Sequence, residues 1–377
     1  MGERLRVAYL LTQDGGGPVD VAVRLARALL DSGEADVRVF GPVPRRGAEL
    51  LGENHERVEV GGKSDVRAGR RARAALLAWR PDVVHAQDRR SGLVAAGLVA
   101  AGLVVAGPRA RCGVVQTYHG VPDDVGEAWF RGVARAPGPS PYTRTVLAAD
   151  AVVARAVHRT VVPARAMGLF LSSRLRVPAR RLAHIDNCVG AARPHPPSGP
   201  VRRLVFVGLL VARKGVATLL EALAVPGVMP ADATLAVVGD GPERARAEVL
   251  AGRLGGRVRF LGFRPDVPEL LRAHDALVLP STMEQQPLVV AEAMAAGKPV
   301  VATDTGGVAD MLGDAGRLAA PGDVAQLAAR LRALFEDPDP GRTGRELAER
   351  ARERFAPGVC AGRHLALYRE VLGWPGG

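Results

Sequence analysis

The sequence predicts an α/β protein built from two doubly wound domains. Short apolar runs alternate with longer amphipathic or alanine-rich segments over most of the 377 residues, as in parallel sheets covered by helices. The alternation stops once, at a proline-rich stretch, and then starts again. The length is enough for two domains that each bury a core. Because such sheets bind ligands at the carboxyl ends of their strands, we expect a ligand cleft between the two domains.

The N-terminal domain is expected over residues 1–190. A first strand-like run leads into a turn of three glycines, Gly15 to Gly17, and a segment with helical spacing of its apolar residues follows. Runs of strand length then alternate with helical segments up to the end of the domain. The expected strands cover 5–11, 37–40, 82–85, 114–118, 150–155 and 183–186, and the expected helices cover 20–30, 67–79 and 92–101.

The rest of the chain is expected to form a linker, a second domain and a C-terminal helix. Residues 191–200 hold four prolines and no periodicity, so we place the linker at 191–202. The second domain covers 203–356, and 357–377 is expected as a helix able to pack back on the N-terminal domain. The expected strands cover 203–207, 234–238, 257–261, 277–279 and 299–302, and the expected helices cover 216–223, 267–273, 323–335 and 344–355, with one more helix opened by Pro287.

The chain has a net positive charge, but this charge does not indicate binding to nucleic acid. The net charge is +12, yet its 48 arginines and three lysines are scattered, and aromatic residues make up only 4%. We therefore expect no nucleic-acid partner and leave weak peripheral contact with a membrane surface open. No apolar run reaches the roughly 18–20 residues that span a bilayer, and no leader is recognised, so we expect a cytoplasmic protein. The three cysteines have no metal-ligand spacing, and no metal site is expected.

The segment from Leu277 to Gly307 is the most informative about function. An apolar strand ends at Pro280, a polar loop carries Glu284, and a helix opened by Pro287 contains Glu292. The first turn of a helix presents unpaired backbone N–H groups that attract anions. Carboxylates cannot hold phosphate oxygens, but they accept hydrogen bonds from hydroxyls. The segment therefore predicts a site for a ligand with both phosphates and sugar hydroxyls.

Four other features are candidates, and each has a structural alternative. Gly16 and Gly17 lie in a turn between strand and helix, where backbone N–H groups can approach an anion, or where the chain simply turns. Lys214 and its neighbour Arg213 suit a diphosphate, although a cation pair is usually a solvated face. His119 closes a strand at the expected cleft, but a lone histidine is more often structural. Gly239 is most simply part of a turn.

Together these residues resemble a known family. Seven residues separate Glu284 from Glu292, and VFVGLL, RKGV, LAVVGDGPE and VRFLGF precede them, with RPDVVHAQ and VVQTYHGVP in the N-terminal half. This pattern resembles the retaining glycosyltransferases of the GT-B fold, family 4, which are marked by two glutamates at this spacing. The resemblance covers nearly the whole chain.

The resemblance implies transfer of a sugar, with retention, from a nucleotide diphosphate sugar such as a UDP- or GDP-sugar. The acceptor is then a small molecule, a saccharide or a lipid, and neither metal nor cofactor takes part. The residues given a catalytic role are His119, Glu284 and Lys214. The residues expected to bind the donor are Gly16, Gly17, Gly208, Arg213, Lys214, Gly239, Phe263, Arg264, Gln285, Gln286, Pro287, Leu288, Val289 and Glu292.

Acceptor recognition is expected in the N-terminal domain, because variable loops carry specificity. Trp129 and Tyr142 are the candidates, although both aromatic rings can equally belong to the core. The oligomeric state is left open.

The chain departs from the family pattern at two places. Leu209 stands where members commonly have an arginine for the diphosphate, and we expect Arg213 to replace it. Gln285, Gln286 and Pro287 stand where Gly-Phe-Gly is common, which leaves the transferred sugar open. The alternatives are a catalytically lapsed nucleotide-sugar-binding or partner subunit and, less favoured, a phosphorylase or epimerase on the same scaffold.

Overall fold

The computed structural model describes residues 4–58, 66–100 and 112–374. The chain divides into two compact units. Unit 1 comprises Met1–Val189 together with Phe355–Gly377, and unit 2 comprises Gly190–Arg354. The C-terminal segment therefore belongs to the same unit as the N-terminal half.

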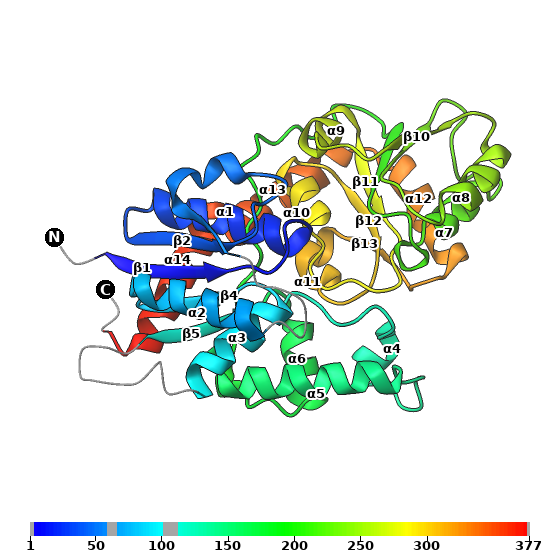
Figure 1. The fold of residues 1–377 in the computed structure, drawn as a ribbon. Helices are drawn as coiled ribbons and strands as arrows, with labels where there is room; N and C mark the ends of the chain where they lie inside the picture. Colours follow the sequence, from blue (N-terminus) through cyan, green and yellow to red (C-terminus); the bar gives the residue numbers. More distant parts are fainter. Residues whose placement is uncertain (1–3, 59–65, 101–111, 375–377) are drawn as a thin grey trace. The chain divides into compact units, whose positions relative to one another are not determined.

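Unit 1 is built on a sheet of seven parallel strands in the order β3-β2-β1-β4-β5-β6-β7 (Figure 1). The order reverses at β1, which pairs with β2 on one side and β4 on the other. The expected doubly wound arrangement is thus confirmed for this unit. The strands are β1 (Leu5–Leu10), β2 (Ala35–Gly41), β3 (His55–Arg57), β4 (Val83–Ala86), β5 (Gly113–Thr117), β6 (Arg159–Val162) and β7 (Leu182–His184).

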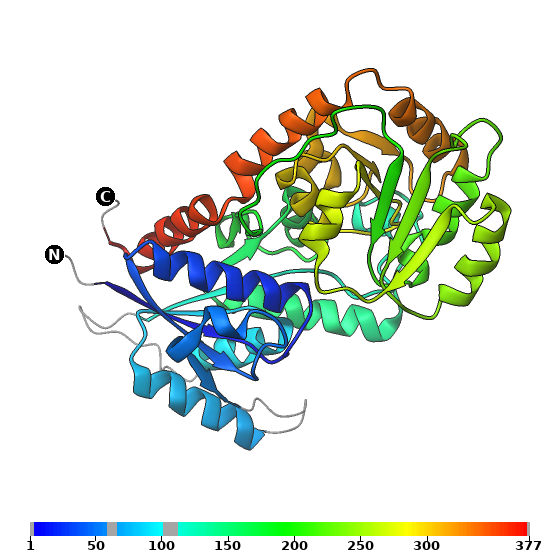
Figure 2. The same ribbon diagram turned by 90° about the horizontal axis from the view of Figure 1, so that it is seen from above.

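Both faces of the sheet in unit 1 are covered by helices. Alternate residues of β1 face opposite ways. Val7 and Tyr9 pack into a core with residues of α1 and α14, whereas Ala8 and Leu10 pack into a second core with residues of α2 and α3. Figure 2 shows α1 and α14 lying along the same side of the strands. The helices are α1 (Gly17–Asp31), α2 (Val66–Trp79), α3 (Arg89–Ala100), α4 (Glu127–Phe130), α5 (Pro141–Ala156), α6 (Arg165–Ser173) and α14 (Pro357–Leu372).

One expected strand is wrong: residues 150–155 lie within helix α5. Ser140 caps this helix by accepting a hydrogen bond from the Thr143 N–H, and Pro141 occupies its first turn. Asp150 and Val153 are buried while Val152 is 64% exposed, which is the periodicity of a helix and not of a strand. The strand of this region, β6, begins at Arg159 and was not predicted, as β3 and, in unit 2, β13 (Arg317–Ala319) were not.

Unit 2 is built on a sheet of six parallel strands in the order β10-β9-β8-β11-β12-β13. The order again reverses at the first strand, β8, as expected for a doubly wound domain. Two strands, β8 and β9, have the bounds that the sequence predicts. The strands are β8 (Arg203–Val207), β9 (Thr234–Val238), β10 (Val258–Gly262), β11 (Ala276–Leu279), β12 (Val300–Thr303) and β13 (Arg317–Ala319).

Helices also cover the sheet of unit 2. Residues of α7, α8 and α12 form a core with Leu204, Phe206 and Val237, while α9, α10 and α11 contact strands β8, β11 and β12. The helices are α7 (Val216–Leu223), α8 (Arg244–Ala251), α9 (Val267–Ala273), α10 (Leu288–Ala295), α11 (Val308–Leu312), α12 (Val324–Phe335) and α13 (Pro340–Phe355). Within the described residues, none of the helices combines the length and the apolar character needed to cross a bilayer.

Candidate active site

The carboxyl edge of the sheet in unit 2 gathers the predicted donor-site residues. Strands β9, β8, β11 and β12 are neighbours, so the segments that follow them meet at one edge. Gly208 follows β8 and Gly239 follows β9. Gly239 has φ +128°, and a Cβ there would lie 1.9 Å from the Gly208 carbonyl oxygen. Only glycine lets these two turns touch, which explains the residue type at a position first read as a simple turn.

A buried ion pair joins two of the predicted catalytic residues. The Lys214 ammonium donates a hydrogen bond to the Glu284 carboxylate, and the two side chains are only 16% and 8% exposed. Lys214 ends the short helix η4 (Ala212–Lys214), and Gly215 follows with φ +69°. A Cβ on Gly215 would lie 2.1 Å from the Pro280 carbonyl oxygen, so the backbone itself presses this turn against the loop after β11.

The loop around Glu284 is also fixed to the turn after β12. The Gly307 N–H donates to the Gln285 carbonyl at 2.7 Å, and a Cβ on Gly306 would lie 1.8 Å from the Glu284 carbonyl oxygen. Three side-chain oxygens in these two segments are buried without a hydrogen-bond partner among the described residues, those of Ser281, Gln285 and Thr305. Since buried polar groups are normally paired, these oxygens suit hydrogen bonds with hydroxyls of a ligand or with water.

Helix α10 begins beside this loop. Pro287 is its N-cap residue, one position before the first helical residue, Leu288. The backbone N–H groups of Leu288 and Val289 lie in the first turn and have no partner within the helix. Glu292 is half-buried further along α10, and Gln286 in the preceding loop is buried. The helix therefore presents donors for an anion, with a carboxylate about one turn away.

The remaining donor candidates lie at the ends of β8 and β10. Phe263 is 70% exposed, and the Arg264 guanidinium pairs with Asp266, with an Nε–Oδ1 distance of 2.8 Å. Leu209 is 57% exposed, so an apolar side chain meets solvent where the resemblance implies an arginine. The Arg213 carbonyl accepts a hydrogen bond from the Thr282 N–H at 2.7 Å, which holds Arg213 beside the loop that carries Glu284.

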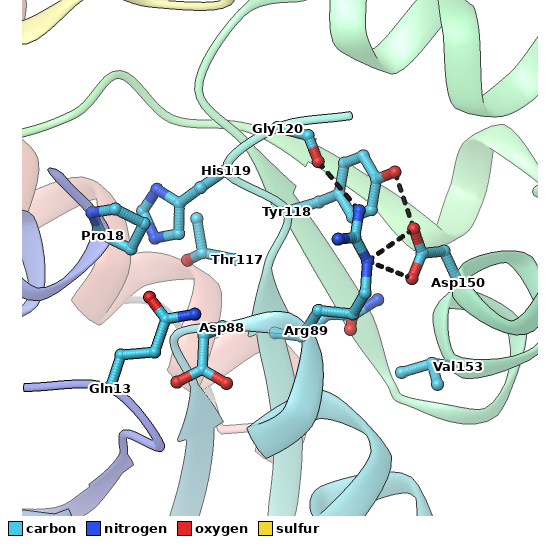
Figure 3. Close-up of a pocket in the computed structure, with 11 residues that line it drawn as sticks. Gln13, Pro18, Asp88, Arg89, Thr117, Tyr118, His119, Gly120, Asp150 and Val153 are labelled. Atoms are coloured by element: carbon cyan, nitrogen blue, oxygen red, sulfur yellow. Dashed lines mark hydrogen bonds and ion pairs between the residues drawn. The ribbon is translucent and has the colours of Figure 1, made fainter. Parts of the chain in front are cut away.

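In unit 1, His119 lies in a polar pocket of about 150 Å³ (Figure 3). Its walls come from the segments that follow β1, β4 and β5 and from helix α5. The polar side chains that line it, besides His119, are those of Gln13, Asp88, Arg89, Gln116, Thr117, Tyr118 and Asp150. Of these residues only His119 was predicted from the sequence.

An ion pair between the part-exposed Arg89 and the buried Asp150 forms one wall of this pocket. The Arg89 Nε donates to both Asp150 oxygens at 2.8 and 3.0 Å, and the Tyr118 hydroxyl donates to Asp150 at 2.9 Å (Figure 3). Arg89 also donates to the Gly120 carbonyl at 3.3 Å. Burial and the Asp150 carboxylate raise the pKa of Tyr118 well above its usual range, so this hydroxyl stays protonated. Asp150 was missed because its segment was expected to be a strand.

Asp88, in the wall of the pocket, links the segments that follow β1 and β4. Its carboxylate accepts hydrogen bonds from the Thr12 N–H at 2.6 Å, the Thr12 hydroxyl at 2.7 Å and the Ser91 N–H at 2.8 Å. It thereby joins the segment after β1 to the start of α3 and uses most of its acceptor capacity. The available signal was its position directly after the VVHAQ strand.

The electrostatic surroundings keep His119 neutral. Its Nε2 lies 3.5 Å from the Gln87 side-chain oxygen. Burial, together with a smaller effect of the nearby His364, lowers the pKa of His119 to about 4. A neutral imidazole can donate a hydrogen bond from one nitrogen and accept one at the other.

The other candidates of unit 1 lie around or outside this pocket. Gly16 is the N-cap of α1 with φ +100°, and Gly17 is its first residue, so their turn adjoins Pro18 of the pocket wall. Trp129 packs edge-on against Phe170 with ring centroids 5.8 Å apart, and it does not line the pocket. Tyr142 is 65% exposed on α5. Their contact with an acceptor stays a prediction.

Comparison with known proteins agrees with this arrangement. Residues 15–193 match the profile described as "Glycosyltransferase Family 4", and residues 201–337 match "Glycosyl transferases group 1". The solved structure of Anabaena Alr3699/HepE in complex with UDP and glucose superposes with a TM-score of 0.75 at 22% identity, covering 97% of this chain and 99% of that one. Sucrose-phosphate synthase from Thermosynechococcus elongatus superposes with a TM-score of 0.76, also at 22% identity, covering 98% and 100%. The two sheets and these neighbours define a GT-B glycosyltransferase fold.

Sequence relatives identify the family to which the chain belongs. The chain is 30% identical to the glycogen synthase of Mycobacterium tuberculosis over 307 residues, which cover 78% of this chain and 69% of that protein. It is 38% identical over 185 residues to the 2-deoxystreptamine glucosyltransferase of Streptomyces kanamyceticus, and this match spans about half the length of each, 46%. The chain belongs to glycosyltransferase family 4.

Proposed function

We propose that this glycosyltransferase takes its sugar from a nucleotide diphosphate sugar held by unit 2. The Lys214–Glu284 ion pair is the observation that supports this most strongly. A buried ammonium beside a helix N-terminus suits a diphosphate, and the half-buried Glu292 on α10 can accept from ribose hydroxyls. The unpartnered oxygens of Ser281, Gln285 and Thr305 suit hydroxyls of the transferred sugar.

The transfer is proposed to retain the configuration at the anomeric carbon and to need no metal. The bond between that carbon and the phosphate oxygen breaks, a bond to the acceptor oxygen forms on the same face, and the departing phosphate takes the acceptor's proton. Lys214 and the first N–H groups of α10 stabilise the negative charge that develops on the phosphate. In this proposal the Lys214 ammonium supplies the positive charge beside the departing phosphate.

The acceptor is proposed to be a small polyhydroxylated molecule bound in the His119 pocket. Amides, hydroxyls and a neutral imidazole line this pocket and can exchange hydrogen bonds with hydroxyls. Two relatives point to an aminocyclitol: the 2-deoxystreptamine glucosyltransferase already described and a 2-deoxystreptamine N-acetyl-D-glucosaminyltransferase from Streptomyces fradiae, 39% identical over 151 residues. 2-Deoxystreptamine is therefore the first acceptor to test.

The donor assignment is tested by titrating UDP and GDP into the purified protein and by measuring nucleotide release from UDP- and GDP-sugars with 2-deoxystreptamine. The Glu292→Ala variant is expected to bind the preferred nucleotide at least about tenfold more weakly, since it loses a charge-assisted hydrogen bond worth roughly 1.5–3 kcal/mol. Glu346→Ala, on the exposed surface of α13, is the matched control. Unchanged nucleotide binding by Glu292→Ala would exclude the role given to Glu292.

One observation favours a second candidate, a nucleotide-sugar-binding subunit that has lost catalysis. Leu209 is exposed where the resemblance implies an arginine. If Arg213 replaces that arginine, Arg213→Ala lowers both donor affinity and turnover, whereas Leu209→Arg changes turnover little. If catalysis has lapsed, the wild-type chain binds nucleotide but releases none from any sugar donor without a partner protein.

A further inference from the structure

A second hollow lies on unit 2, at the edge of the sheet opposite the donor residues. It has a volume of about 290 Å³ and is lined by residues 195–200, Arg202, Arg203, Arg272, Asp275 and Lys298. Arg203 begins β8, Asp275 directly precedes β11, and Lys298 lies just before β12. Lys214 follows the carboxyl end of β8, and Glu284 follows the carboxyl end of β11. The hollow lies at the amino ends of these strands, and the two ends of a five-residue strand are about 15 Å apart. We call this the linker hollow.

The linker hollow has more positive than negative charge. Four of its lining residues are cationic, and Asp275 is its only acidic residue. The Asp275 carboxylate is already occupied, because it accepts from the Arg202 N–H at 2.9 Å, the Arg203 N–H at 2.8 Å and the Arg203 guanidinium at 2.7 Å. The Arg202 guanidinium bonds to Asp232 at 2.8 Å, outside the hollow. Asp275 therefore pairs directly with Arg203 and acts on Lys298 only from a distance, so the hollow keeps an excess of positive charge from Lys298 and the exposed Arg272.

Lys298 is the most informative of these residues. Its side chain is 2% exposed, and its ammonium donates one hydrogen bond, to the Arg272 carbonyl at 3.2 Å. An ammonium has three N–H donors, and no carboxylate among the described residues lies within ion-pair distance of this one. Burial lowers the pKa of Lys298 to about 8, with Asp275 opposing this shift and Arg203 and Arg272 adding to it. A dehydrated cation of this kind gains more from an anion than a solvated one does.

The rim of the hollow is rigid. Prolines 194, 196, 197 and 200 restrict the linker that forms it. The His195 N–H donates to the Ala296 carbonyl at 2.8 Å, which ties the linker to the end of α10. Gly297 has φ +74°, and a Cβ there would lie 3.2 Å from the Pro196 nitrogen, so linker and helix end are in close contact. A preformed rim lowers the entropic cost of binding.

We propose that the linker hollow binds a phosphate-type oxyanion carried by a small free ligand, separate from the donor phosphates. Lys298 and Arg272 provide the positive charge, and Asp275 keeps Arg203 from competing for the ligand. A phosphate group accepts several hydrogen bonds at once, which matches an ammonium with free donors and a guanidinium fork. The proposal does not depend on the sugar-transfer reaction.

The composition of the chain allows a site-resolved test. It has only three lysines, Lys63, Lys214 and Lys298, so protein labelled with ¹³Cε-lysine gives three lysine signals in an NMR spectrum. Lys298→Met and Lys214→Met assign two of them. Titration with inorganic phosphate and with pyrophosphate, at constant ionic strength set with chloride, is expected to shift the Lys298 signal in a saturable way. Its pKa should rise from about 8 by about one unit or more when phosphate is bound.

Variants and a second probe complete the test. Arg272→Gln keeps the carbonyl that binds Lys298 and should weaken the phosphate effect on the Lys298 signal at least about fivefold, whereas Arg253→Gln, an exposed arginine elsewhere on unit 2, should leave it unchanged. Phosphatidylglycerol vesicles, compared with phosphatidylcholine vesicles, test a lipid headgroup as the source. The proposal is overturned if the Lys298 signal shifts only at salt concentrations that shift the Lys214 signal as well, whatever the salt. It is also overturned if the Lys298 signal shifts only with vesicles.

Discussion

At the scale of single residues, the Lys214–Glu284 pair is the strongest support for the proposed donor site of unit 2. Removing an ammonium from water is costly unless a negative charge compensates it. Glu284 provides that compensation while no ligand is bound, and a diphosphate can provide it afterwards. In the proposed reaction the carboxylate is then released to accept hydrogen bonds from the sugar. The ion pair thus keeps the largely buried Lys214 ammonium compensated while no ligand is bound.

This exchange of partners predicts an unusual phenotype for Glu284→Gln. Without the carboxylate, Lys214 is free to pair with the nucleotide, so UDP or GDP should bind about fivefold more tightly, which is about 1 kcal/mol. Turnover should fall by about a hundredfold, because the sugar loses a charged hydrogen-bond acceptor. Titration calorimetry and steady-state rates measure the two effects separately. Weaker nucleotide binding by Glu284→Gln would show that the glutamate contacts the nucleotide itself.

At the scale of elements, helix α14 is fastened to the sheet of unit 1 by a buried polar chain. The Tyr368 hydroxyl lies 3.1 Å from the Tyr9 hydroxyl and 2.7 Å from His85 Nδ1, and His85 Nε2 lies 2.8 Å from the Thr117 hydroxyl. All four side chains are buried, and Thr117 is two residues before His119. The C-terminal helix is therefore coupled to the strand that ends in the pocket.

Removing one hydroxyl tests this coupling. Tyr368→Phe leaves the Tyr9 hydroxyl and His85 Nδ1 without a partner, which should lower the free energy of unfolding by about 2–4 kcal/mol. All three tryptophans belong to unit 1, so denaturant unfolding followed by tryptophan fluorescence reports this unit. Tyr142→Phe, on the surface, should change stability by no more than about 0.5 kcal/mol. Equal stabilities of the two variants would contradict the role of the chain.

The histidines packed between α14 and the sheet predict acid sensitivity of unit 1. Burial lowers the pKa of His364 to about 4 and that of His85 well below its usual range. The unfolded chain, with histidine pKa values near ~6.5, then binds more protons than the folded unit between about pH 4 and 6.5. Stability should therefore fall as the pH drops through this window, by up to about 1.4 kcal/mol per pH unit for each histidine.

Tryptophan-monitored unfolding between pH 7 and pH 4.5 measures this slope. His364→Gln should reduce the slope, because one titrating group is removed. His274→Gln in unit 2 should leave the tryptophan signal's pH dependence unchanged. A wild-type stability that does not vary with pH in this range would mean that the histidines are accessible to protons in the folded unit.

At the scale of the whole molecule, the fold was predictable because its signals are local and periodic. Strand β9 and helices α7 and α9 have the predicted bounds. The failure at 150–155 arose where a short apolar run, Val152-Val153, lies inside an alanine-rich helix whose start depends on Ser140. Glycines such as Gly239 were recognised as turn residues, but the close approach to Gly208 depends on two strands being neighbours, which a single sequence does not contain.

The site residues show the same difference between local signals, which a sequence contains, and contacts between separate segments, which it does not. Residues within one contiguous segment, from Glu284 to Glu292, were predicted from their spacing, and their contact with a donor stays a prediction. The His119 pocket was found only in part, because Asp88, Arg89 and Asp150 come from separate segments that the sheet brings together. The linker hollow was not predicted for the same reason, since Arg203, Arg272 and Lys298 come from separate segments.

The central claim is that this chain alone transfers a sugar with retention. The most direct measurement is the NMR spectrum of the product formed from an α-linked UDP-sugar, or GDP-sugar, and 2-deoxystreptamine with no other protein present. We predict an α-linked product that forms as nucleotide is released, and its loss in Lys214→Met. A β-linked product, or nucleotide bound without any product from either donor class, would contradict the account.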